Sequence, residues 1–497
     1  MVAALHHLTS LYPALLSQEQ RSALGAFYTP PCLSARLLDL ATEGGFDWAT
    51  GRLLDPAAGA GAFLVQAALR LRSSLRDGEP AFVLAQVGVR LSGLELDENA
   101  ARLAQASLEI ALADVVLASG RPVPPVVQIC DTLEEAPSPS FDLVVGNPPY
   151  GRVTLTIEQR ARFSRSLYGH ANLYGVFTDL ALRWTKPGGL IAFLTPTSFL
   201  AGQYYAALRR LLVDEAPPVA LDFVHARKGV FEDVLQETML TVYRKGRAAG
   251  RARVHYLHIA TDCEARVAAN GTVGMPRDAR GPWLAPRSPE HSALIAHAEG
   301  LSSRLRDWGY SVSTGPLVWN RFKSQLSDSA AGRAVHPLIW AESVTSEGRF
   351  IFRALKKHHT PYFRVEPGDE WLLIKEPCVL VQRTTAKEQA RRLIAAELPA
   401  SFVQSHAGVV IENHLNMIRP KGIAKVTPAV VAAVLNSQAV DQLFRCMNGS
   451  VAVSAFELEA LPLPEADALE HLSLLLAEGA ERVVIEAECN RLYGWMS

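Results

Sequence analysis

The tetrapeptide Asn147-Pro148-Pro149-Tyr150 combines residue types that could act on a weakly nucleophilic amino group. The apolar run at 141–145 predicts a buried strand, and the prolines end it because proline supplies no backbone donor. The strand would lead into a rigid loop that offers an amide, a backbone carbonyl and an aromatic ring. In an open α/β sheet, ligands bind outside the carboxyl ends of the strands, which is where this loop would lie.

The amino nitrogen of an adenine ring is a poor nucleophile because its lone pair is delocalised into the ring. The Asn147 side-chain oxygen and the Pro148 carbonyl could each accept one of its N–H groups and favour a tetrahedral, more nucleophilic nitrogen. Tyr150 could stack on the base, which is worth about 1–3 kcal/mol. An ordinary Pro-Pro turn beside a surface tyrosine would have the same four residues, so other motifs must decide.

A glycine-rich segment suggests a small-molecule site. Residues 52–64 predict a strand that ends at Asp55, a tight turn and the start of a helix. The backbone could approach a ligand closely at Gly59 and Gly61. The third glycine of the dinucleotide fingerprint is missing, and no Gly-Lys-Ser/Thr follows. An acidic residue at the strand end disfavours a phosphate and suits a ligand that carries an amine and a sulfonium.

Two further predicted strands end in polar residues. The strand from Val87 to Leu96 carries Glu95, and an acidic residue at the end of a second strand commonly accepts ribose hydroxyls. The strand from Val126 to Cys130 leads to Asp131 and Thr132, where the carboxylate could accept from an adenine amino group. The alternation of strands and helices predicts an α/β fold with a doubly wound sheet.

A fourth motif lies near the start of the chain. Phe27-Tyr28-Thr29-Pro30 precedes a helical pattern, and proline is favourable in the first turn of a helix. The N–H groups at the start of that helix could face a carboxylate ligand. A simple helix cap would explain the same residues.

Composition favours a cytoplasmic globular protein with two or three domains. Hydrophobic residues make up 49% and charged residues 20%. The first residues lack the layout of a signal peptide, and no apolar run approaches the roughly 18 residues that suggest a membrane span. The six cysteines form no CxxC pair, so reduced thiols and no metal site are expected.

The net charge of −1 conceals a basic middle segment. Residues 244–392 contain 24 Lys and Arg against 14 Asp and Glu, a balance of +10, which suggests a polyanionic partner. Aromatic and basic residues are interleaved at 314–323 and 350–358, as on surfaces that follow phosphates and probe base edges. Ordinary strands with solvated faces are the alternative. The candidate DNA-binding residues are Trp319, Arg321, Lys323, Arg353, Lys356 and Lys357.

In the order of these motifs, the chain resembles the gamma group of N6-adenine DNA methyltransferases, the modification enzymes of type II restriction systems. The resemblance implies a Rossmann-like S-adenosylmethionine-dependent catalytic domain and a C-terminal α+β target-recognition domain. The expected boundaries are 1–243 for the catalytic domain, 244–465 for target recognition and 466–497 for a helical tail. Ala58 and Ala60 depart from the family, which commonly has Cys and Ser at these positions.

The resemblance also implies roles for single residues. Thr29 and Asp55 would contact the methionine part of S-adenosylmethionine, Glu95 the ribose and Asp131 the adenine. Asn147 and Pro148 would accept from the target amino group, while Tyr150 and Phe231 would contact the flipped base. The full implied cofactor set is Tyr28, Thr29, Pro30, Asp55, Ala57, Gly59, Gly61, Glu95, Asp131, Thr132 and Asn147, and the implied catalytic set is Asn147, Pro148, Pro149 and Tyr150.

The implied reaction is direct methyl transfer to N6 of an adenine flipped out of a specific double-stranded DNA sequence. A monomeric enzyme and a cognate restriction endonuclease encoded separately are expected. One alternative is a methyltransferase for RNA or a protein glutamine, against which the long basic region beyond residue 244 counts. Another is a non-catalytic DNA-binding specificity protein, against which the intact cofactor set counts.

Overall fold

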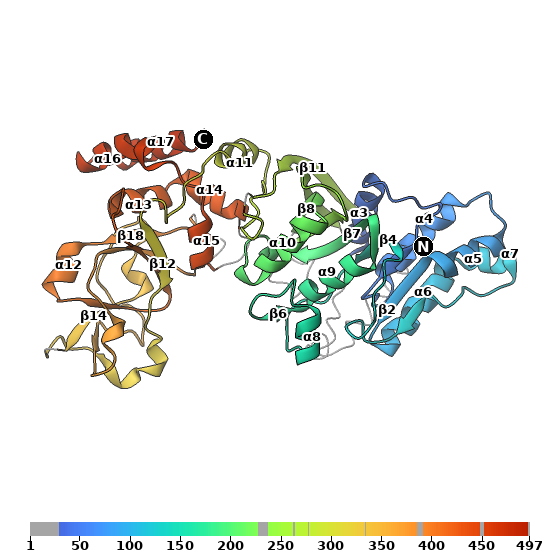
Figure 1. The fold of residues 1–497 in the computed structure, drawn as a ribbon, viewed down its shortest axis with the longest axis horizontal. Helices are drawn as coiled ribbons and strands as arrows, with labels where there is room; N and C mark the ends of the chain where they lie inside the picture. Colours follow the sequence, from blue (N-terminus) through green and yellow to red (C-terminus); the bar gives the residue numbers. More distant parts are fainter. Residues whose placement is uncertain are drawn as a thin grey trace. The chain divides into compact units, whose positions relative to one another are not determined.

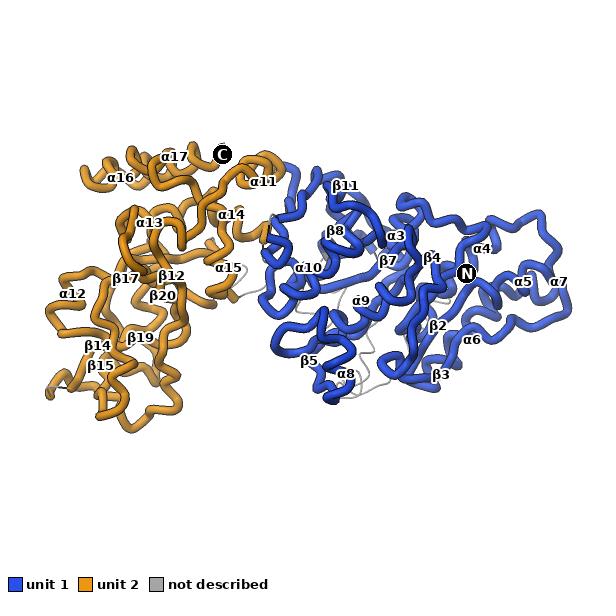
Figure 2. Tube along the Cα trace, viewed as in Figure 1, with its two compact units in different colours: residues 1–289 blue, residues 290–497 orange. Residues whose placement is uncertain are grey.

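The computed structural model describes residues 29–226, 237–261, 264–276, 278–332, 334–384, 391–447 and 452–495. The chain forms two compact units, Met1–Pro289 and Glu290–Ser497, which we call unit 1 and unit 2 (Figure 2). Each unit has apolar clusters of its own, as expected of separate domains.

Unit 1 is built on a large mixed sheet. Among the described residues this sheet has nine strands, in the order β11-β10-β8-β9-β7-β4-β1-β2-β3 (Figure 1). The strands are β1 (Leu53–Asp55), β2 (Leu91–Glu95), β3 (Val127–Ile129), β4 (Phe141–Gly146), β7 (Thr185–Pro196), β8 (Pro218–Ala226), β9 (Thr238–Arg244), β10 (Ala252–Thr261) and β11 (Glu264–Val273). A short separate pair is formed by β5 (Arg152–Val153) and β6 (Ala171–Asn172). The helices are α3 (Pro31–Glu43), α4 (Ala62–Ser74), α5 (Pro80–Arg90), α6 (Glu98–Ala111), α7 (Ala113–Ser119), α8 (Ile157–Arg162), α9 (Leu173–Trp184) and α10 (Ala206–Glu215).

The strands that carry the predicted site run in one direction. β1 pairs in parallel with β2 and β4, β2 pairs in parallel with β3, and β4 pairs in parallel with β7. β9 runs antiparallel between β7 and β8. The expected α/β fold with a Rossmann-like sheet is therefore confirmed. Because parallel strands end at the same edge of a sheet, the loops after β1, β2 and β4 lie close together.

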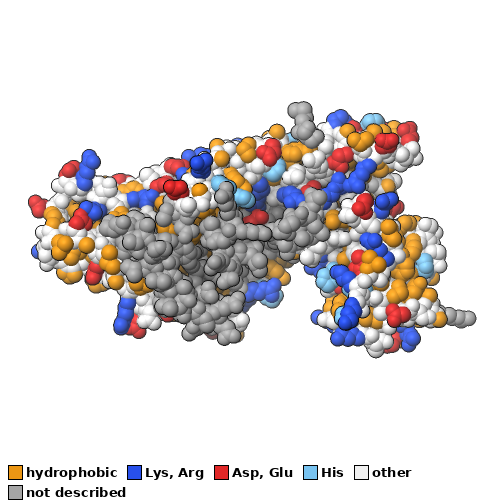
Figure 3. Space-filling view, turned by 180° about the vertical axis from the view of Figure 1, so that it is seen from behind, with side chains coloured by type: hydrophobic (Ala, Val, Ile, Leu, Met, Phe, Trp, Pro, Cys, Tyr) orange, Lys and Arg blue, Asp and Glu red, His pale blue; other side chains and the backbone are white. Residues whose placement is uncertain are grey.

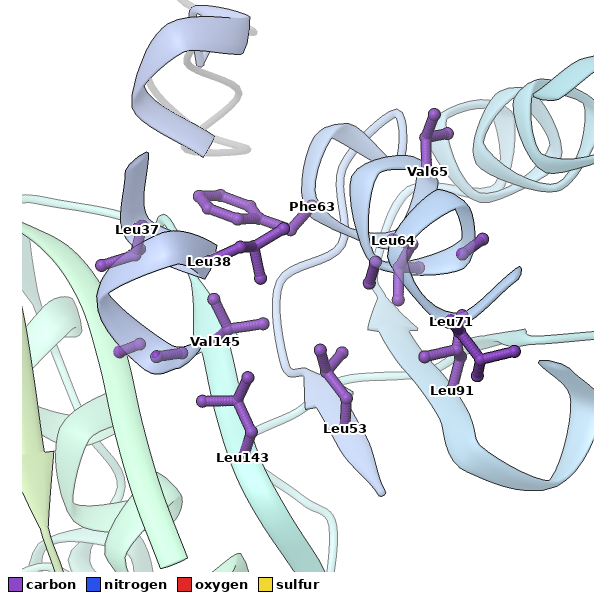
Figure 4. Close-up of a cluster of buried hydrophobic side chains, with 14 of the residues drawn as sticks. Leu37, Leu38, Leu53, Phe63, Leu64, Val65, Leu71, Leu91, Leu143 and Val145 are labelled. Carbon is purple, nitrogen blue, oxygen red and sulfur yellow. The ribbon is translucent and has the colours of Figure 1, made fainter. Parts of the chain in front are cut away.

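Both faces of the sheet are covered. Leu53, Leu143 and Val145 pack with side chains of α3 and α4 on one face (Figure 4). Leu54 and Val144 join the opposite cluster, which contains residues of α9 and α10. Strands that are buried on both faces have continuous apolar runs, and this explains the unbroken apolar sequence before Asn147.

One predicted strand is partly helical. The sequence pattern predicts a strand from Val87 to Leu96, but α5 extends to Arg90 and β2 begins only at Leu91. Val83 and Val87 are buried and lie one turn apart, so they form the apolar face of a helix that packs against the sheet. The preference of valine for strands is too weak to outweigh that burial.

Unit 1 extends beyond the boundary expected between residues 243 and 244. β10 pairs in parallel with β8, and β11 pairs antiparallel with β10. Further along the chain, Trp283 is fully buried in the cluster that contains α9 and α10. The buried Arg209 side chain also donates to the carbonyls of Arg280 and Gly281. The compact unit therefore continues past residue 243, because the sheet extends into the basic segment.

Unit 2 combines two small sheets with helices. Among its described residues, one sheet has the strand order β12-β20-β17-β18 and the other β13-β15-β14-β19-β16. The first sheet consists of β12 (Tyr310–Thr314), β17 (Cys378–Gln382), β18 (Ala395–Leu398) and β20 (Leu415–Pro420). The second consists of β13 (Leu326–Ser327), β14 (Val335–Ile339), β15 (Tyr362–Arg364), β16 (Leu373–Ile374) and β19 (Val409–Ile411). This is the α+β architecture expected for the C-terminal part.

The helices of unit 2 are α11 (His291–Ala298), α12 (Ala400–Ser405), α13 (Pro428–Leu435), α14 (Gln438–Met447), α15 (Ala455–Ala460), α16 (Glu470–Ala477) and α17 (Arg482–Leu492). The segment expected as a separate tail, 466–497, contributes α16 and α17, which pack on α13 and α14 within this unit. In the described part of the chain, every helix is too short or too polar to cross a membrane.

Candidate active site

The polar residues that end β1, β2 and β4 lie at one edge of the sheet. β1 ends at Asp55, β2 ends at Glu95, and Asn147 follows the last residue of β4. A Cβ atom added to Gly146 would lie 2.7 Å from Asp55 Oδ1, so the loops after β1 and β4 are in close contact there. Only glycine fits at position 146, immediately before the Asn147 side chain. The sequence pattern does not single out this residue.

The Asn147 amide is held from two sides. Its Nδ2 donates to Thr29 Oγ1 at 3.0 Å, and its Oδ1 accepts from the Tyr150 hydroxyl at 2.6 Å. Thr29 is buried and precedes Pro30, which forms the N-cap of α3. An amide oxygen has two lone pairs, so Oδ1 can accept a further N–H from a substrate. The contacts therefore hold the amide with its oxygen as an available acceptor.

Tyr150 is anchored through its hydroxyl. Besides Asn147 Oδ1, this hydroxyl lies 3.0 Å from the Leu194 carbonyl oxygen of β7. Its ring is half-buried and meets Tyr174 edge to face, with the ring centroids 6.5 Å apart. Burial raises the pKa of the Tyr150 hydroxyl well above its usual value, so this group remains a neutral donor. The Leu194 carbonyl has no sequence signal, because any residue offers the same backbone group.

Asp55 is completely buried. Its Oδ1 accepts from the Ala57 backbone N–H at 3.1 Å, whereas its Oδ2 has no hydrogen-bond partner among the described residues. Burial, with a smaller contribution from Glu95, raises the pKa of Asp55 to about 8. A buried carboxyl group with an unsatisfied oxygen at a strand end is suited to a ligand that brings a cation or an N–H group.

Glu95 fixes the glycine-rich turn to the end of β2. Its Oε2 accepts from the Gly59 N–H at 2.7 Å, and its Oε1 accepts from the Asp97 N–H at 2.9 Å. Gly59 has a φ of 52°, which favours glycine, and a Cβ at this position would meet no atom within 4 Å. Open space therefore adjoins the turn at Gly59. A Cβ on Gly61 would instead lie 3.0 Å from Ala104, which assigns Gly61 to helix packing.

The loop after β3 joins the same edge. Cys130 N–H donates to the Glu95 carbonyl at 2.9 Å, and the buried Thr132 hydroxyl donates to the Pro56 carbonyl at 2.8 Å. Asp131 is exposed, and its Oδ1 accepts from the Leu133 N–H at 2.9 Å. Thr132 thus connects two of the loops, while the Asp131 side chain faces solvent.

Two of the predicted site residues, Tyr28 and Phe231, lie outside the described residues. Pro148 is buried and Pro149 is half-buried, directly beside the anchored Asn147. The structure thus brings together Thr29, Asp55, Glu95 and Asn147, which come from four separate segments of the sequence.

The predicted DNA-binding residues lie in unit 2 on two neighbouring segments. Trp319 packs edge to face against the buried Trp340, with centroids 6.3 Å apart, and Lys323 Nζ lies 5.9 Å from the Trp319 ring centroid. Trp340 in turn stacks on His359 of the second segment. Arg353 is half-buried and donates to the Glu342 carbonyl. The predicted residues that are exposed are Arg321, Lys323, Lys356 and Lys357.

Known proteins have sequences and folds similar to those of this chain. The family described as N-6 DNA Methylase matches residues 4–269. The type II methyltransferase M.BsuBI of Bacillus subtilis is 27% identical over 352 residues, which cover 69% of each chain. The type II methyltransferase M.PstI of Providencia stuartii is 28% identical over 351 residues, or 68% of this chain and 67% of that protein.

Among solved structures, the type IIL restriction-modification enzyme MmeI in complex with DNA matches this fold with a TM-score of 0.55 at 12% sequence identity. The match covers 99% of this chain and 79% of the MmeI chain. This likeness concerns the fold alone. The family match covers more than half of the chain and includes the loops that hold Asp55, Glu95 and Asn147. The chain belongs to the N-6 DNA methylase family and is an S-adenosylmethionine-dependent DNA methyltransferase.

Proposed function

We propose that the chain methylates N6 of adenine in a specific double-stranded DNA sequence and protects host DNA from a separately encoded restriction endonuclease. It would act in the cytoplasm as a monomer. The observation that carries this proposal is the Asn147 amide, which Thr29 and Tyr150 hold with its oxygen as an acceptor at the end of β4. The two type II methyltransferases among the relatives support the role in restriction and modification.

The residues at the sheet edge fit S-adenosylmethionine. Its amine and sulfonium would find the unsatisfied Oδ2 of Asp55, and its ribose hydroxyls would find Glu95. The open space beside Gly59 leaves room for the ligand next to the backbone. When bound, the cofactor supplies an electrophilic methyl group. Thr29, through its bond to Asn147, would couple the cofactor-binding part of the site to the part that holds the target base.

The protein's contribution to the reaction is to position and polarise the target nitrogen. Asn147 Oδ1 and the Pro148 carbonyl would accept the two N–H groups of the adenine and localise its lone pair. Tyr150 would hold the flipped base by stacking, with its ring position fixed by the hydroxyl contacts to Asn147 and Leu194. Much of the rate enhancement would then come from orientation. The proton lost by the methylated nitrogen passes to solvent.

The choice of substrate class can be tested directly. Purified chain is incubated with S-adenosylmethionine labelled with tritium in its methyl group and with duplex DNA, RNA or a release-factor protein. Label is expected in DNA, as N6-methyladenine after nuclease digestion. Label only in RNA or in protein glutamine would support the alternative methyltransferases, and the absence of label from all three would support a non-catalytic specificity protein.

Cofactor binding is expected to release a proton from Asp55. In the free chain at pH 7 this carboxyl is mostly protonated, because its pKa is about 8. A bound cation favours the ionised form and lowers that pKa, so most of one proton leaves on binding at pH 7 and none leaves well above pH 8. The affinity for S-adenosylmethionine should accordingly rise with pH up to about pH 8. Calorimetry at pH 7 in buffers of different ionisation enthalpy measures the proton, and Asp55→Asn should abolish its release.

Glu95→Ala is expected to weaken S-adenosylmethionine binding by about 1–3 kcal/mol, because ribose hydroxyls and the Gly59 N–H would lose their acceptor. Isothermal titration gives the affinity. Asp97→Ala is the matched control, since Asp97 caps α6 through the Ala100 N–H and has no assigned ligand contact. Equal affinity of Glu95→Ala and the unsubstituted chain would assign Glu95 a structural role only.

A further inference from the structure

A single glutamate fixes a loop of unit 2 that we call the basic loop, residues 353–359. Glu342 Oε1 accepts from the Leu355 N–H at 3.1 Å and from His359 Nδ1 at 2.7 Å. The Glu342 backbone carbonyl accepts from Arg353 Nε at 2.5 Å. Burial raises the pKa of Glu342, but hydrogen bonds from His359 and Leu355 outweigh it and lower the pKa overall. The carboxylate therefore remains ionised and holds both ends of the loop.

Aromatic packing makes the base of the basic loop rigid. The His359 ring stacks on the buried Trp340 ring, with centroids 3.6 Å apart and planes 10° apart. Trp340 Nε1 donates to the Thr360 carbonyl at 2.7 Å. Just before the loop, Phe352 packs against Phe402 with centroids 5.4 Å apart. Each end of the loop is thus held by both a ring contact and a hydrogen bond.

The tip of the basic loop points away from these contacts. Leu355 is 68% exposed, and Lys356, Lys357 and His358 are exposed beside it. Among the described residues, neither lysine forms an ion pair, and the His359 N–H closes the tip on the Lys356 carbonyl at 2.9 Å. Figure 3 shows cationic and apolar side chains side by side on the surface of unit 2.

From this geometry we infer that the basic loop is a preformed contact for duplex DNA and that Glu342 is the positioning residue for it. Lys356 and Lys357 bind phosphates, and Leu355 lies against the adjoining groove. A loop that is already ordered loses less conformational freedom on binding than a mobile one. Glu342 does not repel the phosphates, because its charge faces inward onto His359. The inference deepens the proposed function and rests on it.

The test is the salt dependence of binding to a short mixed-sequence DNA duplex, measured by fluorescence anisotropy. Each neutralised phosphate contributes about 0.9 to the slope of log affinity against log salt, so the double variant Lys356→Ala/Lys357→Ala should lower the slope by about 1.8. Glu342→Ala should also lower the slope although both lysines remain. Lys375→Ala, an exposed lysine of the same unit outside the loop, should leave the slope unchanged.

A triple variant separates positioning from general damage to the fold. If Glu342 acts through the two lysines, Glu342→Ala should have no further effect in the chain that already lacks them. Glu342→Gln keeps an acceptor of the same size for the Leu355 N–H and removes only the charge opposite His359. This folded variant should lower the slope of log affinity against log salt by less than Glu342→Ala does. The inference would be overturned if Glu342→Ala lowered the salt slope as much in the chain without the two lysines as in the chain with them. It would also be overturned if the double lysine variant left the slope unchanged.

Methyl transfer to DNA by the unsubstituted chain is measured alongside. Methylated DNA with unchanged slopes would overturn the role of the basic loop alone. Failure to methylate DNA would overturn the proposed function instead.

Discussion

Asn147→Ala is expected to lower the rate of methyl transfer at least about 100-fold, the scale seen when one preorganised polar group is removed from an active site. The amide oxygen polarises the target nitrogen only as it reacts, so kcat should fall while the affinities for cofactor and DNA stay nearly unchanged. Single-turnover transfer of tritiated methyl groups measures the chemical step, and titration measures both affinities.

Two further variants test how the amide is held. Asn147→Asp keeps the size of the side chain but removes the Nδ2 donor to Thr29, so it should also be strongly impaired. Thr29→Ser retains the hydroxyl acceptor for Asn147 Nδ2 and should stay active. Thr29→Val removes that acceptor and should lower kcat. An Asn147→Ala enzyme that keeps a tenth of the activity would contradict the role of Asn147 in the chemical step.

A chain that ends at Tyr243 is expected not to fold, whereas a chain that ends at Pro289 is expected to fold. The shorter chain lacks β10 and β11 and leaves the edge of β8 unpaired. It also loses the burial of Trp283, and removal of a large buried aromatic side chain alone costs about 3–5 kcal/mol. The buried Leu257 and Ile259 of β10 are lost as well, at about 2–5 kcal/mol each, so the combined loss is comparable with the roughly 5–15 kcal/mol by which a domain is stable.

Circular dichroism during heating distinguishes the two chains. The chain ending at Pro289 should show one cooperative transition and bind S-adenosylmethionine, since the described cofactor-site residues all lie in unit 1. The chain ending at Tyr243 should show neither property. Cooperative melting of the shorter chain would show that β10, β11 and Trp283 are dispensable for the unit, and would support the boundary at residue 243 that the change in composition suggests.

The ends of the strands were readable from the sequence, because they depend on neighbouring residues. An apolar run followed by Asp-Pro places Asp55 at the end of β1, and one followed by Gly-Asn-Pro-Pro places Asn147 after β4. The sequence places Glu95 near the end of a strand even though the strand predicted from Val87 includes residues of α5, because the predicted strand and β2 end within one residue of each other. These motifs also carried the resemblance that the family match later confirmed.

The contacts between these motifs were decided only by the tertiary structure. Thr29 and Asn147 are 118 positions apart, and nothing in either local sequence indicates that their side chains bond to each other. Glu342 gave no signal because an isolated glutamate is normally a solvated surface residue, and only packing brings Leu355 and His359 to its carboxylate. β10 joins the sheet of unit 1 because it pairs with β8 and buries Leu257 and Ile259, and the basic composition of this segment does not indicate that pairing. Local order follows from backbone sterics and residue periodicity, whereas the pairing of distant segments depends on which arrangement buries the most apolar surface and satisfies the most polar groups.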